Sequence, residues 1–151
     1  MIKVCLIGAD VEKEKSLLES QSGIFLKRIP IASLDEMLDD IAINTPDILV
    51  ISDVCGKIDA DSLCLHTYML NPAIRTLIIT AEDADYQRLE NTGFSSKGFM
   101  LHEQRHAIVR AVRVMHDGEA WLSRKLVTAV MDHLASSSLA AKRKPRLINN
   151  K

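Results

Sequence analysis

The chain has 151 residues, of which 47% are hydrophobic and 26% are charged, and its formal net charge is −1. This length suits one domain with a sizeable core plus a short appendage, and the composition is that of a globular protein rather than a disordered one. A net charge near zero excludes a chain that binds nucleic acid over its whole surface. No apolar run is long enough to cross a membrane, so we expect a cytoplasmic protein.

Strand and helix patterns alternate along the first 116 residues. Short apolar runs predict five strands, which cover residues 2–8, 24–29, 48–51, 76–80 and 98–101. The segments that follow them predict helices, one between Asp10 and Gly23 and four more over residues 33–41, 61–70, 83–90 and 103–116. Asp10 is expected to cap the first helix, and Ser33 with Glu36 predicts a capping box for the second. This order predicts an α/β fold with a doubly wound parallel sheet and helices on both faces.

The third strand is apolar throughout, which is typical of a strand covered on both faces of a parallel sheet. In such sheets, chemistry collects just beyond the carboxyl ends of the strands. Ser52 and Asp53 follow the third strand directly, so they are the first candidates for a functional site. The three cysteines show no metal-ligand spacing; Cys5 and Cys64 are expected to be buried thiols, and Cys55 lies in a loop where redox sensing is an alternative.

A sixth helix is predicted from Trp121 to Leu134, because its apolar residues form one stripe that needs a surface to lie against. The remaining residues are small, polar and basic. We divide the chain into residues 1–117 as the α/β domain, 118–135 as a linker and dimerisation helix, and 136–151 as a basic flexible linker.

Three segments, PDILVIS at 46–52, TLIIT at 76–80 and KGFML at 97–101, resemble the receiver domain of two-component response regulators. The resemblance covers residues 1–116 and implies a flavodoxin-like sheet of five parallel strands with an added sixth C-terminal helix. The segment that follows, DGEAWLSRKLV at 117–127, resembles the linker helix of the NarL/LuxR group. The resemblance implies a homodimer, and it implies contact with DNA only through a helix-turn-helix domain that we expect to be missing from this chain.

The receiver resemblance also places the phosphorylation machinery. The relevant positions are Gly8 and Ala9 for the acidic pair, Ser52 for the phosphoacceptor aspartate, His102 for the lysine, Thr80 for the hydroxyl and Phe99 for the aromatic switch. Only the last two match the receiver pattern. Because the carboxylates that hold Mg²⁺ are missing, we expect no Mg²⁺ and no phosphorylation. The alternative is a phosphoacceptor that uses Asp53, with Asp10 replacing the acidic pair.

The segment Trp121-Leu122-Ser123-Arg124 has two interpretations. In the structural one, Trp121 packs into the core, Ser123 caps the sixth helix, and Arg124 with Lys125 is solvated. In the functional one, WLSR resembles the W-[FLM]-[ST]-R signature of VpsT-like biofilm regulators, which have degenerate receivers and dimerise around cyclic di-GMP. A helix amino terminus, a hydroxyl and a guanidinium suit phosphate and guanine, with Lys125 assisting.

We therefore expect the signal-input and dimerisation domain of a LuxR-type transcription regulator, with cyclic di-GMP as its preferred input and no enzymatic activity. A ligand-free pseudo-receiver that serves dimerisation or protein docking is the first alternative. A conventional phosphoacceptor domain is the second.

Overall fold

The computed structural model describes the backbone of residues 1–149 and the side chains as far as Arg143. The strands are β1 (Ile2–Ile7), β2 (Ile24–Arg28), β3 (Ile48–Ser52), β4 (Arg75–Thr80) and β5 (Ser96–Leu101). The α-helices are α1 (Glu12–Glu19), α2 (Leu34–Asn44), α3 (Ala60–Leu70), α4 (Tyr86–Asn91), α5 (Ile108–His116) and α6 (Arg124–Asn149). A 3₁₀ helix, η1 (His102–Ala107), leads into α5.

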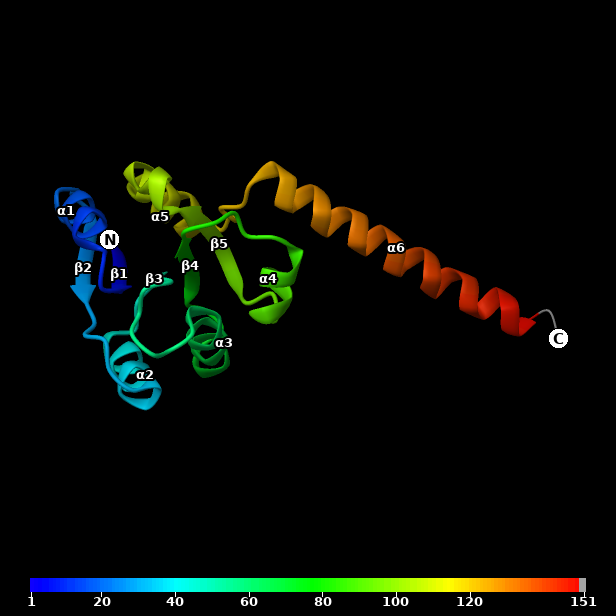
Figure 1. Cartoon of the computed structure of the whole chain (residues 1–151), viewed down its shortest axis with the longest axis horizontal. Coiled ribbons are helices and arrows are strands. Elements are labelled where there is room, and N and C mark those ends of the chain that lie inside the picture. Colours follow the sequence, from blue (N-terminus) through cyan, green and yellow to red (C-terminus); the bar gives the residue numbers. More distant parts are fainter. Residues whose placement is uncertain (150–151) are drawn as a thin grey trace.

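The strands form one parallel sheet in the order β2-β1-β3-β4-β5. The central strand β3 is buried at every position, which explains why its sequence is apolar without alternation. In Figure 1, α1 and α5 lie on one side of the sheet, and α2 and α3 lie on the other. The predicted doubly wound sheet is therefore confirmed.

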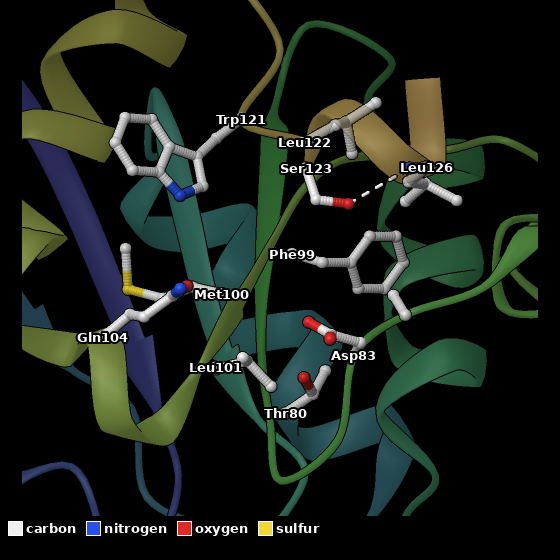
Figure 2. A pocket seen from close by; sticks show the side chains of 11 residues that line it. Thr80, Asp83, Phe99, Met100, Leu101, Gln104, Trp121, Leu122, Ser123 and Leu126 are labelled. Atoms are coloured by element: carbon white, nitrogen blue, oxygen red, sulfur yellow. Dashed lines mark hydrogen bonds between the residues drawn. The ribbon is translucent and has the colours of Figure 1, made fainter. Parts of the chain in front are cut away.

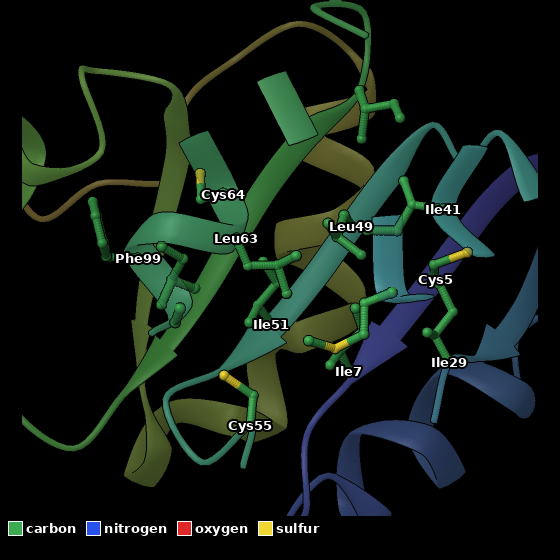
Figure 3. Close-up of a cluster of buried hydrophobic side chains, with 14 of the residues drawn as sticks. Cys5, Ile7, Ile29, Ile41, Leu49, Ile51, Cys55, Leu63, Cys64 and Phe99 are labelled. Atoms are coloured by element: carbon green, nitrogen blue, oxygen red, sulfur yellow. The ribbon is translucent and has the colours of Figure 1, made fainter. Parts of the chain in front are cut away.

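Each face of the sheet has its own apolar core, because successive residues of a strand point to opposite faces. Cys5 and Ile7 of β1 pack beneath α2 and α3 (Figure 3). Val4 and Leu6 of the same strand belong to the second core, which α1 and α5 cover. Because both faces of the sheet are packed, the strands are held in place, and the loops at their carboxyl ends start from fixed positions.

Three of the local predictions can be compared directly with these elements. The predicted helix over 103–116 is split into η1 and α5. Most of the segment predicted as a flexible linker over 136–151 continues α6 as far as Asn149, although it includes three serines and Pro145; its last two residues lie outside the described residues. The hydroxyl of Ser33 accepts a hydrogen bond from the N–H of Glu36, as expected for a cap of α2.

α6 starts on the body of the molecule and then runs far beyond it (Figure 1). Leu126 is buried near its start, and the His133 ring stacks on Tyr86 of α4 at a centroid distance of 4.1 Å. These two contacts dock the first turns of α6 on α4. None of the helices within the described residues has both the length and the apolar character that a membrane span requires.

Candidate functional site at the carboxyl end of the sheet

Ser52 stands at the end of β3 and is fully buried. Its hydroxyl donates a hydrogen bond to Oδ1 of Asp10 at 2.7 Å and accepts one from the N–H of Val54 at 3.2 Å. Asp10 was predicted to cap α1, and this was wrong: the cap position is Val11, without a side-chain hydrogen bond. The hydroxyl of Ser52 holds the Asp10 carboxylate toward β3 instead.

Gly8 and Ala9 follow β1 and supply no carboxylate. A Cβ atom added at Gly8 would lie 2.7 Å from the Cβ of Ser52 and 2.7 Å from Cγ1 of Val11. Both neighbours are fully buried, so they have little room to move. This packing has no space for any side chain at position 8.

His102 begins η1, with its Nδ1 atom 3.5 Å from Oδ2 of Asp10. The guanidinium of Arg105 lies 2.5 Å from the same Nδ1. Because a guanidinium only donates, Nδ1 must act as the acceptor, and the contact with Asp10 is not an ion pair through this nitrogen. Asp10 also stands between Ser52 and His102, so the three groups lack the order of a Ser-His-Asp relay. Nε of Arg105 lies 3.8 Å from the fully buried carboxylate of Glu14 on α1.

Asp53 points to a different partner, Arg88 of α4. The Arg88 guanidinium bonds Oδ1 of Asp53 at 2.5 Å and Oδ2 at 3.3 Å, and its Nε bonds both oxygens of Asp61 at 2.7 and 2.9 Å. It also lies 5.7 Å above the ring of Phe99, within the range of a cation–π contact. We call Asp53, Asp61 and Arg88 the arginine clamp.

The arginine clamp shifts the pKa values of Arg88 and Asp61. Burial lowers the pKa of Arg88, but hydrogen bonds to Asp53 and Asp61 raise it by more, so the guanidinium stays charged. Burial raises the pKa of Asp61, and the bond to Arg88 offsets this only in part. No sequence pattern points to Arg88, because its partners lie 27 and 35 residues away.

The two positions that match the receiver pattern are both turned inward. The Thr80 hydroxyl donates to the carbonyl of Glu82 at 2.6 Å. Phe99 is 8% exposed and packs with Leu126 of α6. The loop thiol of Cys55 is also buried, and burial raises its pKa to about 11, which disfavours the reactive thiolate that redox sensing needs.

The segment at residues 121–125 joins the sheet before α6 begins. The N–H of Trp121 bonds the carbonyl of Lys97 at 2.9 Å, and its carbonyl accepts from the N–H of Phe99 at 3.0 Å. This bridge along β5 is why α6 starts at Arg124 rather than at Trp121. The Ser123 hydroxyl accepts from the N–H of Leu126 at 3.1 Å, so it caps α6.

The side chains of this segment follow the structural interpretation. Trp121 packs against the core beneath α5, and Arg124 and Lys125 are exposed. The cap leaves the hydroxyl proton of Ser123 free to donate to a ligand. These side chains therefore serve the fold and still present a cationic helix amino terminus to solvent.

A hollow of about 210 Å³ lies beside this segment at the outer edge of β5. Figure 2 shows Trp121 and Gln104 on one side of β5, and Phe99, Ser123 and Asp83 on the other. The complete lining is Thr80, Asp83, Ala84, Phe99, Met100, Leu101, Gln104, Trp121, Leu122, Ser123 and Leu126. A neighbouring hollow of about 270 Å³ lies between α4 and α6 and includes Lys125.

The strand order and the helices on both faces define the fold of a CheY-like receiver domain of response regulators. The chain is similar to a LuxR-family two-component response regulator from Aurantimonas sp. SI85-9A1, at 18% identity and a TM-score of 0.73, over 89% of this chain and 99% of that one. It is also similar to a LuxR-family DNA-binding response regulator from Silicibacter pomeroyi, at 18% identity and a TM-score of 0.65, over 82% and 98% of the two chains.

A third similar structure is the isolated receiver domain of RcsB from Salmonella enterica serovar Typhimurium, with the phosphomimetic BeF₃⁻. It is 10% identical, with a TM-score of 0.68, over 85% of this chain and 97% of that one. No protein-family profile and no curated protein matches the chain. At these identities the likeness establishes the receiver fold. Within the described residues, no three His, Cys, Asp or Glu side chains come together to hold a metal ion.

Proposed function

We propose that the chain is the signal-input and dimerisation domain of a LuxR-type transcription regulator, and that it works without phosphorylation and catalyses no reaction. The observation that carries the proposal is the state of the acceptor position. Ser52 is fully buried there, and its hydroxyl is bonded to the carboxylate of Asp10. A serine hydroxyl in this setting cannot form the acyl phosphate on which receivers depend.

The residues present do not fit the Mg²⁺ ion that receivers use. Magnesium prefers an octahedron of oxygen ligands that includes carboxylates. Position 8 has no space for a side chain, and one oxygen of Asp10 already accepts from Ser52. Without a cation to neutralise the transferring group, phosphoryl transfer loses most of its stabilisation.

Asp53 is a poor substitute acceptor, because both of its oxygens are bonded to the Arg88 guanidinium. An attack by this carboxylate would have to break the arginine clamp and leave Asp61, which is 6% exposed, without its partner. The arginine clamp thus supports the proposal that the domain works without phosphorylation, over the alternative in which Asp53 accepts a phosphoryl group.

Incubation with acetyl phosphate and Mg²⁺, followed by intact-mass measurement, tests this part of the proposal. We expect an unchanged mass for the intact chain and also for Arg88→Ala, in which Asp53 is released but the cation site is still absent. A gain of one phosphoryl group that Asp53→Asn abolishes would overturn the proposal in favour of the acceptor alternative.

For the input we propose cyclic di-GMP, bound at Trp121, Leu122, Ser123 and Arg124 with help from Lys125. Two exposed cationic side chains and the free hydroxyl proton of Ser123 stand at the amino terminus of a long helix, where the helix dipole favours phosphate. An arginine fork can also stack on guanine or bond its edge. The hollow beside this segment gives a base somewhere to enter.

Calorimetry with cyclic di-GMP tests this input. We expect binding by the intact chain, loss of binding in Arg124→Ala, and unchanged binding in Arg143→Ala. Arg143 is an exposed arginine of the same helix, about 28 Å further along it, so it controls for a general loss of positive charge. Absence of binding heat with the intact chain would contradict cyclic di-GMP as the input. The ligand-free domain for dimerisation or protein docking would then be favoured.

A further inference from the structure

We infer that Asp83 selects guanine, because its carboxylate is placed to accept hydrogen bonds from the Watson–Crick edge of a base in the hollow beside α6. This inference rests on the proposed binding of cyclic di-GMP and goes beyond it, since it assigns the choice of base to a residue outside the WLSR segment.

An acidic side chain lines the hollow that lies beside the binding site proposed for an anionic ligand. Asp83 lines the hollow together with Ser123, and it also lines the neighbouring one together with Lys125. Figure 2 shows its carboxylate pointing into the space below Phe99. A carboxylate at this place repels phosphate, so it needs another explanation.

The Asp83 carboxylate has no structural role that would explain its position in the hollow. Within the described residues its carboxylate makes no hydrogen bond or ion pair, whereas the next acid along the chain, Asp85, caps α4 by accepting from the N–H of Arg88 at 2.9 Å. Asp83 is exposed on the loop between β4 and α4. Both of its oxygens are therefore available to a ligand.

The size of the hollow determines which part of the ligand enters. Pockets for whole drug-sized ligands measure about 300–1,000 Å³, and this hollow measures about 210 Å³. It suits one base and not the whole dinucleotide. Phe99, Leu122 and Leu126 give it an apolar wall, and the phosphates then lie outside, toward Ser123 and Arg124.

Guanine is the base that matches a carboxylate. Its Watson–Crick edge carries two adjacent donors, N1–H and the N2 amino group, and an ionised carboxylate offers two acceptors and no donor. Adenine presents an acceptor at N1 beside its amino group, so one carboxylate oxygen would face a lone pair. Enzymes and binding proteins read unstacked bases through this edge.

The test compares cyclic di-GMP with cyclic di-AMP in calorimetry, using the intact chain, Asp83→Asn and Glu82→Gln. Glu82 is a matched control, because it lies on the same loop but does not line this hollow. Both substitutions remove one negative charge. If charge alone mattered, both would strengthen binding of an anionic ligand.

We expect Asp83→Asn to weaken cyclic di-GMP binding by about tenfold or more, since a charged hydrogen bond is lost, and Glu82→Gln to leave it unchanged or tighter. We also expect the intact chain to reject cyclic di-AMP and Asp83→Asn to accept it better, because an amide both donates and accepts. Far-ultraviolet circular dichroism should be the same for all three proteins.

Equal binding of the two dinucleotides by the intact chain would overturn the inference, as would tighter cyclic di-GMP binding by Asp83→Asn. Loss of binding in Arg124→Ala with full binding in Asp83→Asn overturns the inference alone and leaves the proposed ligand in place. An intact chain that binds neither dinucleotide overturns both.

Discussion

Gly8 occupies the point where β1 enters the loop toward α1, and its missing side chain is part of the packing there. The Cβ of Ser52 and Cγ1 of Val11 close over it from two sides. Gly8→Ala should therefore lower the free energy of unfolding by about 1–3 kcal/mol, because it overfills a packed site.

Urea unfolding followed by circular dichroism measures this effect. The adjacent, exposed Ala9 provides the control, and Ala9→Asp should change stability by no more than about 0.5 kcal/mol. An unaltered midpoint for Gly8→Ala would mean that position 8 has room for a side chain, and the steric argument against Mg²⁺ would then fail.

Ser123 has a structural role and a proposed binding role that can be separated at the residue scale. Ser123→Ala removes the cap of α6 and should cost about 1 kcal/mol. Ser123→Asp keeps the cap, since aspartate is an equally good cap residue, and adds a negative charge at the helix amino terminus. We expect Ser123→Asp to be as stable as the natural chain and yet to lose cyclic di-GMP.

Thermal unfolding and calorimetry on the same samples check both halves of this prediction. Retained ligand binding in Ser123→Asp would place the phosphates elsewhere. A stability loss in Ser123→Asp equal to that of Ser123→Ala would show that the cap is not what the hydroxyl contributes.

At the scale of elements, the arginine clamp ties three segments together, namely the loop after β3, the start of α3 and α4. It joins them through one guanidinium that also lies over Phe99 of β5. We interpret the clamp as a fixed link between these three segments.

Arg88→Ala leaves Asp61 buried without a partner and should destabilise the chain by about 1–3 kcal/mol at pH 7. The penalty should shrink as the pH falls. Burial raises the pKa of Asp61 and Arg88 opposes this, so removing Arg88 raises that pKa further. A carboxyl with a raised folded-state pKa stabilises the fold below its unfolded pKa and loses this contribution as the pH rises through the folded value.

Urea unfolding at pH 7 and pH 5 measures the difference. Arg88→Ala combined with Asp61→Asn should recover part of the stability at pH 7, because the buried charge is gone. A penalty that is the same at both pH values, with no recovery in the double variant, would contradict this role for Asp61.

For the whole molecule, the sequence predicts what depends on local pattern and misses what depends on distant contacts. The alternation of apolar runs and helical stretches was enough to predict the sheet, and the cap of α2 at Ser33 was predicted correctly. The cap assigned to Asp10 was wrong, because its carboxylate meets Ser52, 42 residues away. The isolated β-bridge at Trp121 was missed for the same reason, since its partners lie on β5.

The candidate site residues were predicted from their resemblance to the receiver pattern and the WLSR signature. A resemblance of this kind can name only residues at positions that those patterns include. It named Ser52 and the segment at residues 121–125 as candidates. It had no place for Arg88, whose role follows from helix α4 lying over two carboxylates. It had none for Asp83 either, which lies near Ser123 only because the segment before α6 returns to the edge of the sheet.

The surface of α6 leads to the last prediction. Val127, Met131 and Leu134 are 41%, 65% and 62% exposed and recur at helical spacing along one stripe of α6. An exposed apolar stripe of this kind marks an interaction surface, and a second copy of the same helix fits it best, because a twofold axis pairs the stripe with itself. We expect the chain to be a dimer through α6, and Met131→Lys to be a monomer.

Sedimentation velocity over a range of concentrations, with and without cyclic di-GMP, measures the oligomeric state. Met69→Lys is the matched control, because Met69 is 68% exposed on α3, away from α6, and this variant should still dimerise. Since Met131 is largely exposed in a single copy, its replacement should leave the unfolding of the isolated protomer unchanged. A dimer that survives Met131→Lys and is lost in Met69→Lys would move the interface from α6 to α3.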